Sequence, residues 1–285
     1  MILVAGANGN VGREVVKQLQ ERGVACRALV RDAARHGAME SALCEVVQGD
    51  FFDLSSLQNA LDGCERAFLA SPLDARMTEM QSNFIETCQH VGVRHVVKLS
   101  SMGASARSPV LLGKWHGESE VQLENSGLDW TQIRPAYFMQ NTLAWASEIK
   151  KLNAFPWPFA DAKVSWIDAH DIAACGVRAL ENDAYFGKRL NVTSDEALGA
   201  EDVAQVLSRV LEVDIKARPV SLDEYRQSLL DAGLSLEIAD ALKQLHGVLA
   251  QGHGATITKD VENVTQKPPR TLEDFVNHNA KFFGK

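Results

Sequence analysis

Residues 6–12 read Gly-Ala-Asn-Gly-Asn-Val-Gly, between an apolar run at 2–5 and a segment at 11–21 whose apolar residues share one helical face. A glycine-rich turn between a strand and a helix binds the pyrophosphate of a dinucleotide. Its glycines permit the tight turn, the close approach of backbone to phosphate, and close packing of the helix. The helix N-terminus adds free N–H groups. A turn without a ligand is the alternative interpretation. The predicted binding residues are Gly6, Asn8, Gly9, Asn10, Val11 and Gly12.

The elements that follow this turn alternate between strand and helix. Strands are expected at 2–5, 26–30, 45–48, 66–70, 95–100 and 129–133, and helices at 11–21, 54–61, 77–91 and 110–126. This alternation predicts right-handed βαβ crossovers and a parallel sheet. We therefore expect an α/β fold with a Rossmann-type doubly wound sheet, whose NAD(P)-binding domain spans residues 1–150.

The second half of the chain contains more helices and fewer strands. Helices are expected at 171–181, 200–211, 221–231, 235–250 and from near 271, and strands at 189–193 and 215–219. We interpret residues 151–285 as a smaller, helix-rich substrate-binding portion, with some elements that rejoin the main sheet.

The composition is that of a globular chain: 46% of the 285 residues are hydrophobic and 23% are charged. The formal net charge is −8 and no long basic run occurs, which argues against nucleic acid as a partner. Five dispersed cysteines are read as reduced core thiols, and the histidines show no metal-binding spacing. No apolar run is long enough for a membrane span, and the chain opens on a strand rather than a signal peptide. We expect a cytoplasmic protein without a metal.

The end of the second strand indicates which dinucleotide is preferred. An acidic residue there usually binds the ribose hydroxyls of NAD, whereas this chain has Arg31, followed by Asp32. A guanidinium can bind a 2′-phosphate through paired, charge-assisted hydrogen bonds. We predict NADP(H) as the preferred cofactor, with NAD(H) possible and a merely solvated Arg31 as the alternative. Asp32, one residue on, is expected to face elsewhere.

The ends of the third and fourth strands supply further candidates. Asp50 and Phe51 follow the third strand, where a carboxylate can accept from the adenine amino group and an aromatic ring can pack beside it. A turn that caps the next helix is the alternative. Ligands in such folds bind at the carboxyl ends of strands, so the residues after the fourth strand are expected beneath the nicotinamide half. These residues are Ala70, Ser71 and Pro72.

Several segments in a fixed order carry a family resemblance. They are GANGNVG (6–12), VRD (30–32), GDF (49–51), VVKLSS (96–101), HGESE (116–120), SGLDWTQIRP (126–135) and PRTLEDF (269–275). Over nearly its whole length the chain resembles the NmrA-like atypical short-chain dehydrogenase/reductase family, which includes quinone oxidoreductase type 2, triphenylmethane and azo-dye reductases, and redox-sensing regulators. The resemblance implies NADPH binding across the sheet edge, with substrate bound beside the C-terminal portion. It adds Ser100, Pro135, Tyr137, Phe138 and Asn141 to the cofactor-binding residues.

The Tyr-x-x-x-Lys pair of typical short-chain dehydrogenases is missing, since none of the three tyrosines is followed by Lys four residues later. In the helix where that pair would lie, Lys114 is predicted to stabilise negative charge and His116 to donate a proton. The alternatives are a solvated lysine and a hydrogen-bonding histidine. A quinone or azo dye delocalises the incoming electrons, so such acceptors need no strong acid. Two interpretations remain for the aromatic residues at 145, 155, 157, 159 and 166. They line a pocket for a flat substrate or, as such residues more often do, they form core.

Two functions follow from these observations. The first is an NAD(P)H-dependent reductase that transfers hydride to quinones or similar conjugated acceptors such as azo or triarylmethane dyes. The alternative is a non-catalytic NADP(H)-binding redox sensor that regulates a protein partner. An isomerase or epimerase is a distant third, because such relatives also need the missing tyrosine. The expected partner is a small aromatic or quinonoid molecule, and the oligomeric state, monomer or homodimer, is left open.

Overall fold

A computed structural model describes residues 1–284, and these fall into two compact units. Unit 1 comprises Met1–Pro109, Gly113–Arg134 and Ile172–Asn191; unit 2 comprises Val110–Leu112, Pro135–Asp171 and Val192–Lys285. The elements that lie mainly in unit 1 are β1 (Ile2–Ala5), α1 (Asn10–Glu21), β2 (Cys26–Val30), α2 (Ala33–His36), η1 (Gly37–Met39), β3 (Cys44–Gln48), α3 (Leu54–Leu61), β4 (Arg66–Leu69), α4 (Met77–Val91), β5 (His95–Leu99), α5 (Leu111–Glu124), β6 (Asp129–Pro135), α7 (Ala169–Glu181), η3 (Asp183–Tyr185) and β10 (Lys188–Val192).

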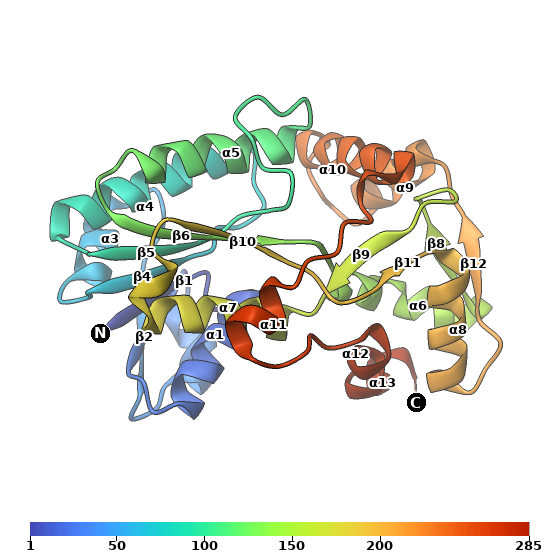
Figure 1. Cartoon of the computed structure of the whole chain (residues 1–285), viewed down its shortest axis with the longest axis horizontal. Helices are drawn as coiled ribbons and strands as arrows, with labels where there is room; N and C mark the ends of the chain where they lie inside the picture. Colours follow the sequence, from blue (N-terminus) through green and yellow to red (C-terminus); the bar gives the residue numbers. More distant parts are fainter. Residues whose placement is uncertain (285) are drawn as a thin grey trace. The chain divides into compact units, whose positions relative to one another are not determined.

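Unit 1 is built on a sheet with the strand order β10-β6-β5-β4-β1-β2-β3 (Figure 1). The pairs from β3 through β6 are all parallel. Helices α3, α4 and α5 cover one face of this sheet, and α1 and α7 cover the other (Figure 1). The strand order reverses between β1 and β4, and at such a switch point an open α/β sheet binds its ligand. The predicted Rossmann-type doubly wound fold is confirmed.

The two faces of the sheet explain why these strands formed where the sequence predicted them. One face packs β1, β2, β4 and β5 side chains against α3, α4 and α5, in a core that includes Leu3, Leu69, Phe84 and Val96. Apolar burial on both faces is what a parallel sheet requires, and short apolar runs reveal such strands in the sequence. The observed strand ends lie within two residues of the expected ones. β10 comes from the second half of the chain and forms the edge next to β6.

Unit 2 contains two small sheets with the orders β11-β9-β7 and β12-β8. Its strands are at most four residues long, and their partners are far apart in sequence: Tyr137 pairs with Trp166, and Lys216 with Ala154. Its elements are β7 (Tyr137–Phe138), η2 (Met139–Trp145), α6 (Ala146–Leu152), β8 (Ala154–Trp157), β9 (Val164–Ile167), β11 (Ala197–Leu198), α8 (Ala200–Leu211), β12 (Lys216–Pro219), α9 (Leu222–Asp231), α10 (Leu236–Val248), η4 (Leu249–His253), α11 (Asp260–Thr265), α12 (Leu272–His278) and α13 (Ala280–Phe283).

The aromatic residues of unit 2 form its core. The rings of Trp145 and Phe155 stack with centroids 4.8 Å apart, and those of Trp157 and Phe159 meet edge to face at 4.9 Å. Trp166 is completely buried, and all five belong to one apolar cluster. Of the two interpretations of these residues, the core is therefore the one that the packing supports.

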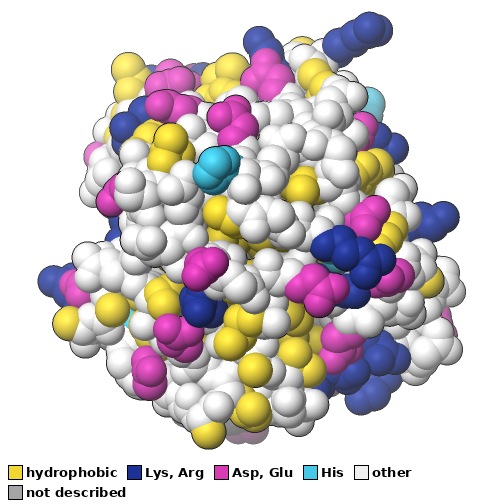
Figure 2. Space-filling view, turned by 90° about the vertical axis from the view of Figure 1, so that its left-hand side faces the viewer, with side chains coloured by type: hydrophobic (Ala, Val, Ile, Leu, Met, Phe, Trp, Pro, Cys, Tyr) yellow, Lys and Arg dark blue, Asp and Glu magenta, His cyan; other side chains and the backbone are white. Residues whose placement is uncertain are grey.

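The charges on the surface and the state of the cysteines agree with the expectations from the composition. On the face of the molecule shown in Figure 2, basic side chains are interspersed with acidic ones. All five cysteines are buried and unpaired by disulfides. Within residues 1–284, no helix has the length and apolar character needed to cross a membrane, and no group of three or more His, Cys, Asp or Glu side chains has metal-binding geometry.

Candidate functional site

The glycine turn has the backbone geometry that a phosphate-binding turn needs. Gly6 has a φ of 68°, and a Cβ at this position would lie 2.3 Å from the carbonyl oxygen of Ala70. A Cβ on Gly12 would lie 2.2 Å from the Gly6 carbonyl oxygen, so the first turn of α1 packs directly on the loop. The Gly9 amide donates to the Gly6 carbonyl at 2.9 Å. Both close contacts require glycine, because any side chain would overlap backbone atoms.

The predicted phosphate-binding residues divide into exposed and buried members. Asn8, Gly9 and Asn10 are exposed, whereas Val11 and Gly12 are buried. Gly9 is the N-cap of α1 and no side chain caps the helix. The amides of the first turn are therefore available to an anion, since they have no intrahelical acceptors. Contact between these residues and a pyrophosphate stays a prediction.

The end of β2 separates Arg31 from Asp32. The Asp32 carboxylate accepts from the Arg35 amide at 3.3 Å and pairs with the Arg35 guanidinium at 3.0 Å, which caps α2. Arg31 is exposed and forms no hydrogen bond or ion pair with any residue of the described chain, 1–284. The Asp32 carboxylate is thus bonded to Arg35 of α2, whereas the Arg31 guanidinium is available to a phosphate. That Arg31 binds one stays a prediction.

The segment after β3 forms a turn. Asp50 accepts a hydrogen bond from the Phe52 amide at 2.8 Å, as expected for a turn, but the residue that caps α3 is Asp53, whose side chain accepts from the Ser56 amide. The Phe51 ring packs against Phe84, with centroids 5.9 Å apart, and belongs to the unit 1 core. Asp50 is only half-buried, so its carboxylate retains accessible surface. The adenine contacts of Asp50 and Phe51 stay predictions, and the ring of Phe51 has little free surface with which to make one.

The end of β4 lies against the glycine turn. The parallel register pairs Val4 of β1 with Phe68 of β4, which brings Ala70 beside Gly6. Ser71 accepts a hydrogen bond from the Gln81 side chain at 2.8 Å, and Pro72 is exposed. The structure thus brings together the ends of β1 and β4 at one edge of the sheet, as expected for a nucleotide site.

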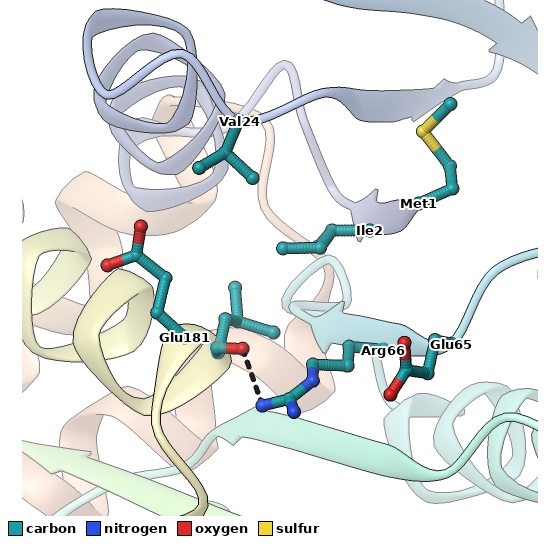
Figure 3. A pocket seen from close by; sticks show the side chains of 7 residues that line it. Met1, Ile2, Val24, Glu65, Arg66 and Glu181 are labelled. Atoms are coloured by element: carbon teal, nitrogen blue, oxygen red, sulfur yellow. Dashed lines mark hydrogen bonds between the residues drawn. The ribbon is translucent and has the colours of Figure 1, made fainter.

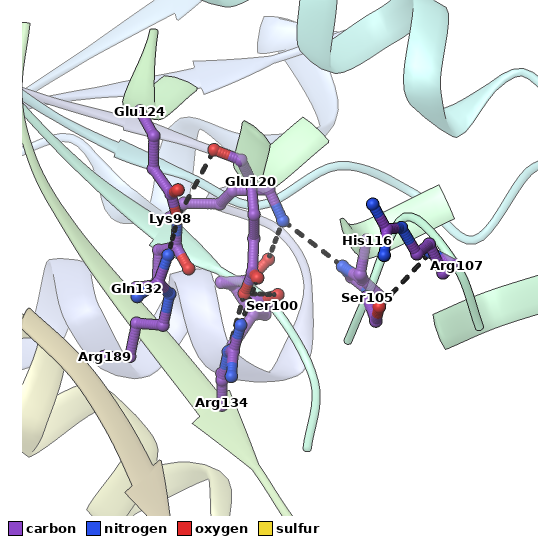
Figure 4. A network of polar contacts seen from close by, with 11 residues as sticks. Lys98, Ser100, Ser105, Arg107, His116, Glu120, Glu124, Gln132, Arg134 and Arg189 are labelled. Carbon is purple, nitrogen blue, oxygen red and sulfur yellow. Dashed lines mark hydrogen bonds and ion pairs between the residues drawn. The ribbon is translucent and has the colours of Figure 1, made fainter. Parts of the chain in front are cut away.

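A buried polar network lies between the carboxyl halves of β5 and β6 and helix α5 (Figure 4). Ser100 donates to the Glu120 carboxylate at 2.6 Å, and the Arg134 Nε donates to it at 2.8 Å. A second Arg134 nitrogen contacts the other carboxylate oxygen. The Glu120 side chain is only 4% exposed, so this ion pair is largely shielded from water. Ser100, a predicted cofactor-binding residue, therefore belongs to a polar interior, and its contact with a nucleotide stays a prediction.

Lys98 is the member of this network that the sequence reasoning missed. It is completely buried, and its Nζ lies 3.3 Å from Nδ1 of His116 and 3.4 Å from the Leu99 carbonyl oxygen. Burial lowers the pKa of Lys98 from 10.5 to about 7; Glu120 opposes this shift and Arg134 adds to it. The signal in the sequence was a lysine inside a predicted strand of a parallel sheet, because such strands are buried on both faces and are normally apolar.

The two predicted catalytic residues lie on different faces of α5. The Lys114 side chain is 48% exposed and pairs with Glu118 at 3.8 Å, one turn along the helix. His116 points to Lys98, and burial, followed by the charge of Lys98, lowers the pKa of His116 well below 6.5. His116 is therefore a neutral imidazole at pH 7. A chemical role for either residue stays a prediction.

The remaining predicted cofactor-binding residues belong to unit 2. Pro135 is buried, Phe138 is half-buried and Asn141 is exposed. The Tyr137 hydroxyl lies 3.2 Å from Nε2 of His246, whose Nδ1 donates to the Leu242 carbonyl at 2.8 Å. Because Nδ1 carries the proton, Nε2 accepts from the tyrosine. Burial raises the pKa of Tyr137 well above its ordinary value, so Tyr137 stays protonated.

A surface cavity of about 300 Å³ lies at the opposite end of the sheet (Figure 3). Met1, Ile2, Glu65 and Arg66 line it from the amino ends of β1 and β4, with Glu181 at the end of α7. Ligands of open α/β sheets bind at carboxyl ends, and the Arg66 guanidinium is already bonded to the Leu180 carbonyl at 2.8 Å and to Asp183 at 2.7 Å. We do not assign this cavity to the nucleotide.

Comparisons with known proteins agree with the geometry. The NAD(P)H-binding family model matches residues 6–183. An NAD(P)H azoreductase of Xenophilus azovorans is 35% identical over 284 residues, which cover 100% of this chain and 99% of that protein. The structure of the NADPH-dependent quinone oxidoreductase QOR2 of Escherichia coli, complexed with NADPH, has a TM-score of 0.88 at 26% identity, over 98% of this chain and 100% of that one. The Citrobacter triphenylmethane reductase complexed with NADP(H), at 20% identity, a TM-score of 0.85, and 98% and 99% coverage, shares the fold. The resemblance found in the sequence is confirmed.

Proposed function

The chain belongs to the NAD(P)H-binding family, and from this premise we propose that it is an NAD(P)H-dependent reductase of quinones, azo dyes or triarylmethane dyes. The observation that carries the proposal is the glycine turn. Its close contacts at Gly6 and Gly12 require glycine, and because no side chain caps α1, the amides of its first turn are open at the switch point of the sheet. Amides at a helix N-terminus bind phosphate, and the bound nucleotide would supply a hydride.

The class of acceptor follows from what the chain lacks. Reduction of an isolated ketone creates a basic alkoxide that needs the acidic tyrosine of a Tyr-x-x-x-Lys pair, and this sequence has no such pair. A conjugated acceptor spreads the incoming charge over its rings, so orientation beside the nucleotide contributes most of the rate. The relative at 35% identity is an azoreductase, which favours catalysis over a purely regulatory role.

The test is the oxidation of NADPH and NADH by the purified protein with a panel of quinones, azo dyes and triarylmethane dyes. We expect steady-state turnover with at least one class, visible as loss of nucleotide absorbance at 340 nm. Tight binding of the nucleotide with no turnover on any acceptor would remove the reductase and leave the sensor. Absence of nucleotide binding would remove both.

We further propose that the protein prefers NADPH to NADH. Arg31 supports this preference, because its exposed guanidinium lies at the end of β2 while Asp32 is held by Arg35. Arg31→Met should raise the Kd of NADPH about 10- to 100-fold, the effect of one to two charge-assisted hydrogen bonds, and leave that of NADH nearly unchanged. Arg209→Met, an exposed arginine of α8 paired with Glu273, is the matched control. An equal loss for both nucleotides would contradict the preference. A cytoplasmic location stays a prediction.

A further inference from the structure

We propose that Lys98 and His116 form a proton relay that completes reduction of the acceptor, with His116 as the proton donor and Lys98 as the positioning residue behind it. The proposal rests on the reductase function proposed above and adds Lys98 behind His116, the proton donor that the sequence suggests. It assigns a role to a lysine that the family resemblance did not single out.

The position of Lys98 in the sheet is the first argument. Lys98 pairs with Leu69 of β4, one residue before Ala70, whose carbonyl oxygen lies against Gly6. Alternation along β5 puts Lys98 on the same face as Val96 and Ser100, the face that α5 covers. The relay therefore lies at the ligand-binding edge of the sheet, within unit 1.

The direction of the hydrogen bond is the second argument. The Lys98 ammonium has only donors, so Nδ1 of His116 is the acceptor in their 3.3 Å contact. As long as Lys98 is charged, the ring proton of His116 is therefore on Nε2. Lys98 has no accessible surface, whereas His116 retains some. Of the two groups, only His116 can reach a substrate, and Lys98 can act only through it. Figure 4 shows His116 beyond the end of the Lys98 side chain.

The surrounding charges are the third argument. Glu120 on α5 and Arg134 on β6 face Lys98, but both Glu120 oxygens are occupied by Ser100 and Arg134. Within residues 1–284 no carboxylate forms an ion pair with Lys98, and a purely structural role would be filled better by a methionine of similar length. Because its pKa is about 7, Lys98 can both lose and regain a proton near neutral pH. A buried lysine of this kind suits acid–base work.

The proton transfer balances without any further reactant. The reduced acceptor is an anion once the nucleotide has supplied a hydride. The Nε2–H bond of His116 breaks as an O–H or N–H bond forms on that anion. A Lys98 Nζ–H bond breaks as an Nδ1–H bond forms on the same imidazole. His116 ends as the other neutral tautomer and Lys98 as a neutral amine. Both are reset when a proton from water binds Nε2 of His116 and the Nδ1 proton returns to Nζ of Lys98.

The experiment compares Lys98→Met, His116→Gln and the double variant with two controls, Lys151→Met on α6 and His90→Gln on α4, which replace exposed residues of the same types. Each relay variant should lower kcat at pH 7 by about 10²-fold, the lower range for a general acid, and the double variant should lose no more than either single one. The dissociation constant of the nucleotide should stay within about twofold of wild type, since neither residue is assigned to nucleotide binding. The controls should match wild type.

A second readout needs no turnover. In ¹⁵N-labelled wild-type protein at pH 6, the His116 ring should show an unprotonated Nδ1 and a protonated Nε2. Its shifts should change with a midpoint near pH 7 as Lys98 titrates. Lys98→Met should abolish that midpoint.

The two proposals can fail separately. Turnover by wild type with unchanged kcat in both single variants would overturn the relay and leave the reductase. Additive losses in the double variant would also overturn the relay, because independent effects would then explain them. A protonated Nδ1 on His116 would overturn it without any reference to activity. No turnover by wild type would overturn the reductase and, with it, the relay.

Discussion

Lys98→Met, which removes the buried ammonium, should stabilise the protein at neutral and acidic pH. This stabilisation should disappear at basic pH. Lys98 has a pKa of about 7 in the folded protein and 10.5 as its ordinary value. The unfolded chain therefore binds a proton more readily than the native chain between these values. A base whose folded pKa is depressed costs stability in full below pH 7, and the cost falls as pH rises toward 10.5.

The magnitude follows from the two pKa values. At 1.36 kcal/mol per pKa unit, the cost of the Lys98 charge is about 5 kcal/mol at pH 6 and about 1 kcal/mol at pH 10. Lys98→Met removes this cost and leaves Nδ1 of His116 without a donor, which costs about 1–2 kcal/mol at every pH. The difference in unfolding free energy between variant and wild type should therefore fall by about 4 kcal/mol from pH 6 to pH 10.

The assay is urea unfolding of both proteins at five pH values between 6 and 10, followed by circular dichroism. Groups that titrate equally in both proteins cancel from the difference. Lys151→Met is the control, because its exposed ammonium should give a difference that does not depend on pH. A pH-independent difference for Lys98→Met would show that Lys98 is not a desolvated ammonium, and the reasoning on its pKa would be refuted.

Three further substitutions test the site. Gly12→Ala should lower the free energy of unfolding by about 1–3 kcal/mol and weaken nucleotide binding, measured by calorimetry, at least tenfold, because its Cβ would lie 2.2 Å from a carbonyl oxygen. Gly37→Ala, which has open space around it, is the control, and equal tolerance of both substitutions would contradict the close contact. Glu120→Gln should lower the free energy of unfolding in urea by about 3 kcal/mol, because Arg134 loses its buried partner. The control Glu118→Gln, in an exposed ion pair, should lower it by less than about 0.5 kcal/mol, and similar losses for both would contradict a shielded network. Tyr137→Phe should lower the free energy of unfolding by about 1–2 kcal/mol, seen as a lower Tm, because Nε2 of His246 loses its donor. An unchanged Tm would mean that this hydrogen bond does not stabilise the protein.

The small strands of unit 2 show where prediction from the sequence fails. β7 and β9 are two and four residues long, and they pair across about thirty positions, Tyr137 with Trp166. Segments this short carry no reliable period, and a distant partner stabilises them. The aromatic residues nearby are consistent with a pocket or a core in the sequence, and only their packing around Trp166 distinguishes the two.

The buried network shows the same limit within unit 1. The sequence places Lys98 in a strand and His116 in a helix, but it does not show that a lysine there is fully buried, nor that the two nitrogens meet at 3.3 Å. It also directed attention to Lys114, which the structure places half-exposed beside Glu118. Burial and the pairing of charges depend on which faces of β5 and α5 meet.

The sequence alone determined the nucleotide-binding fold, because its signals are local: glycines that only a tight turn and a close helix require, and apolar runs with the period of a strand or a helix. The tertiary structure alone decided which polar side chains share the interior between β5, β6 and α5. Desolvation and hydrogen-bond geometry arise only when elements distant in sequence pack together, so the protonation states of Lys98 and His116 could not be read from the chain.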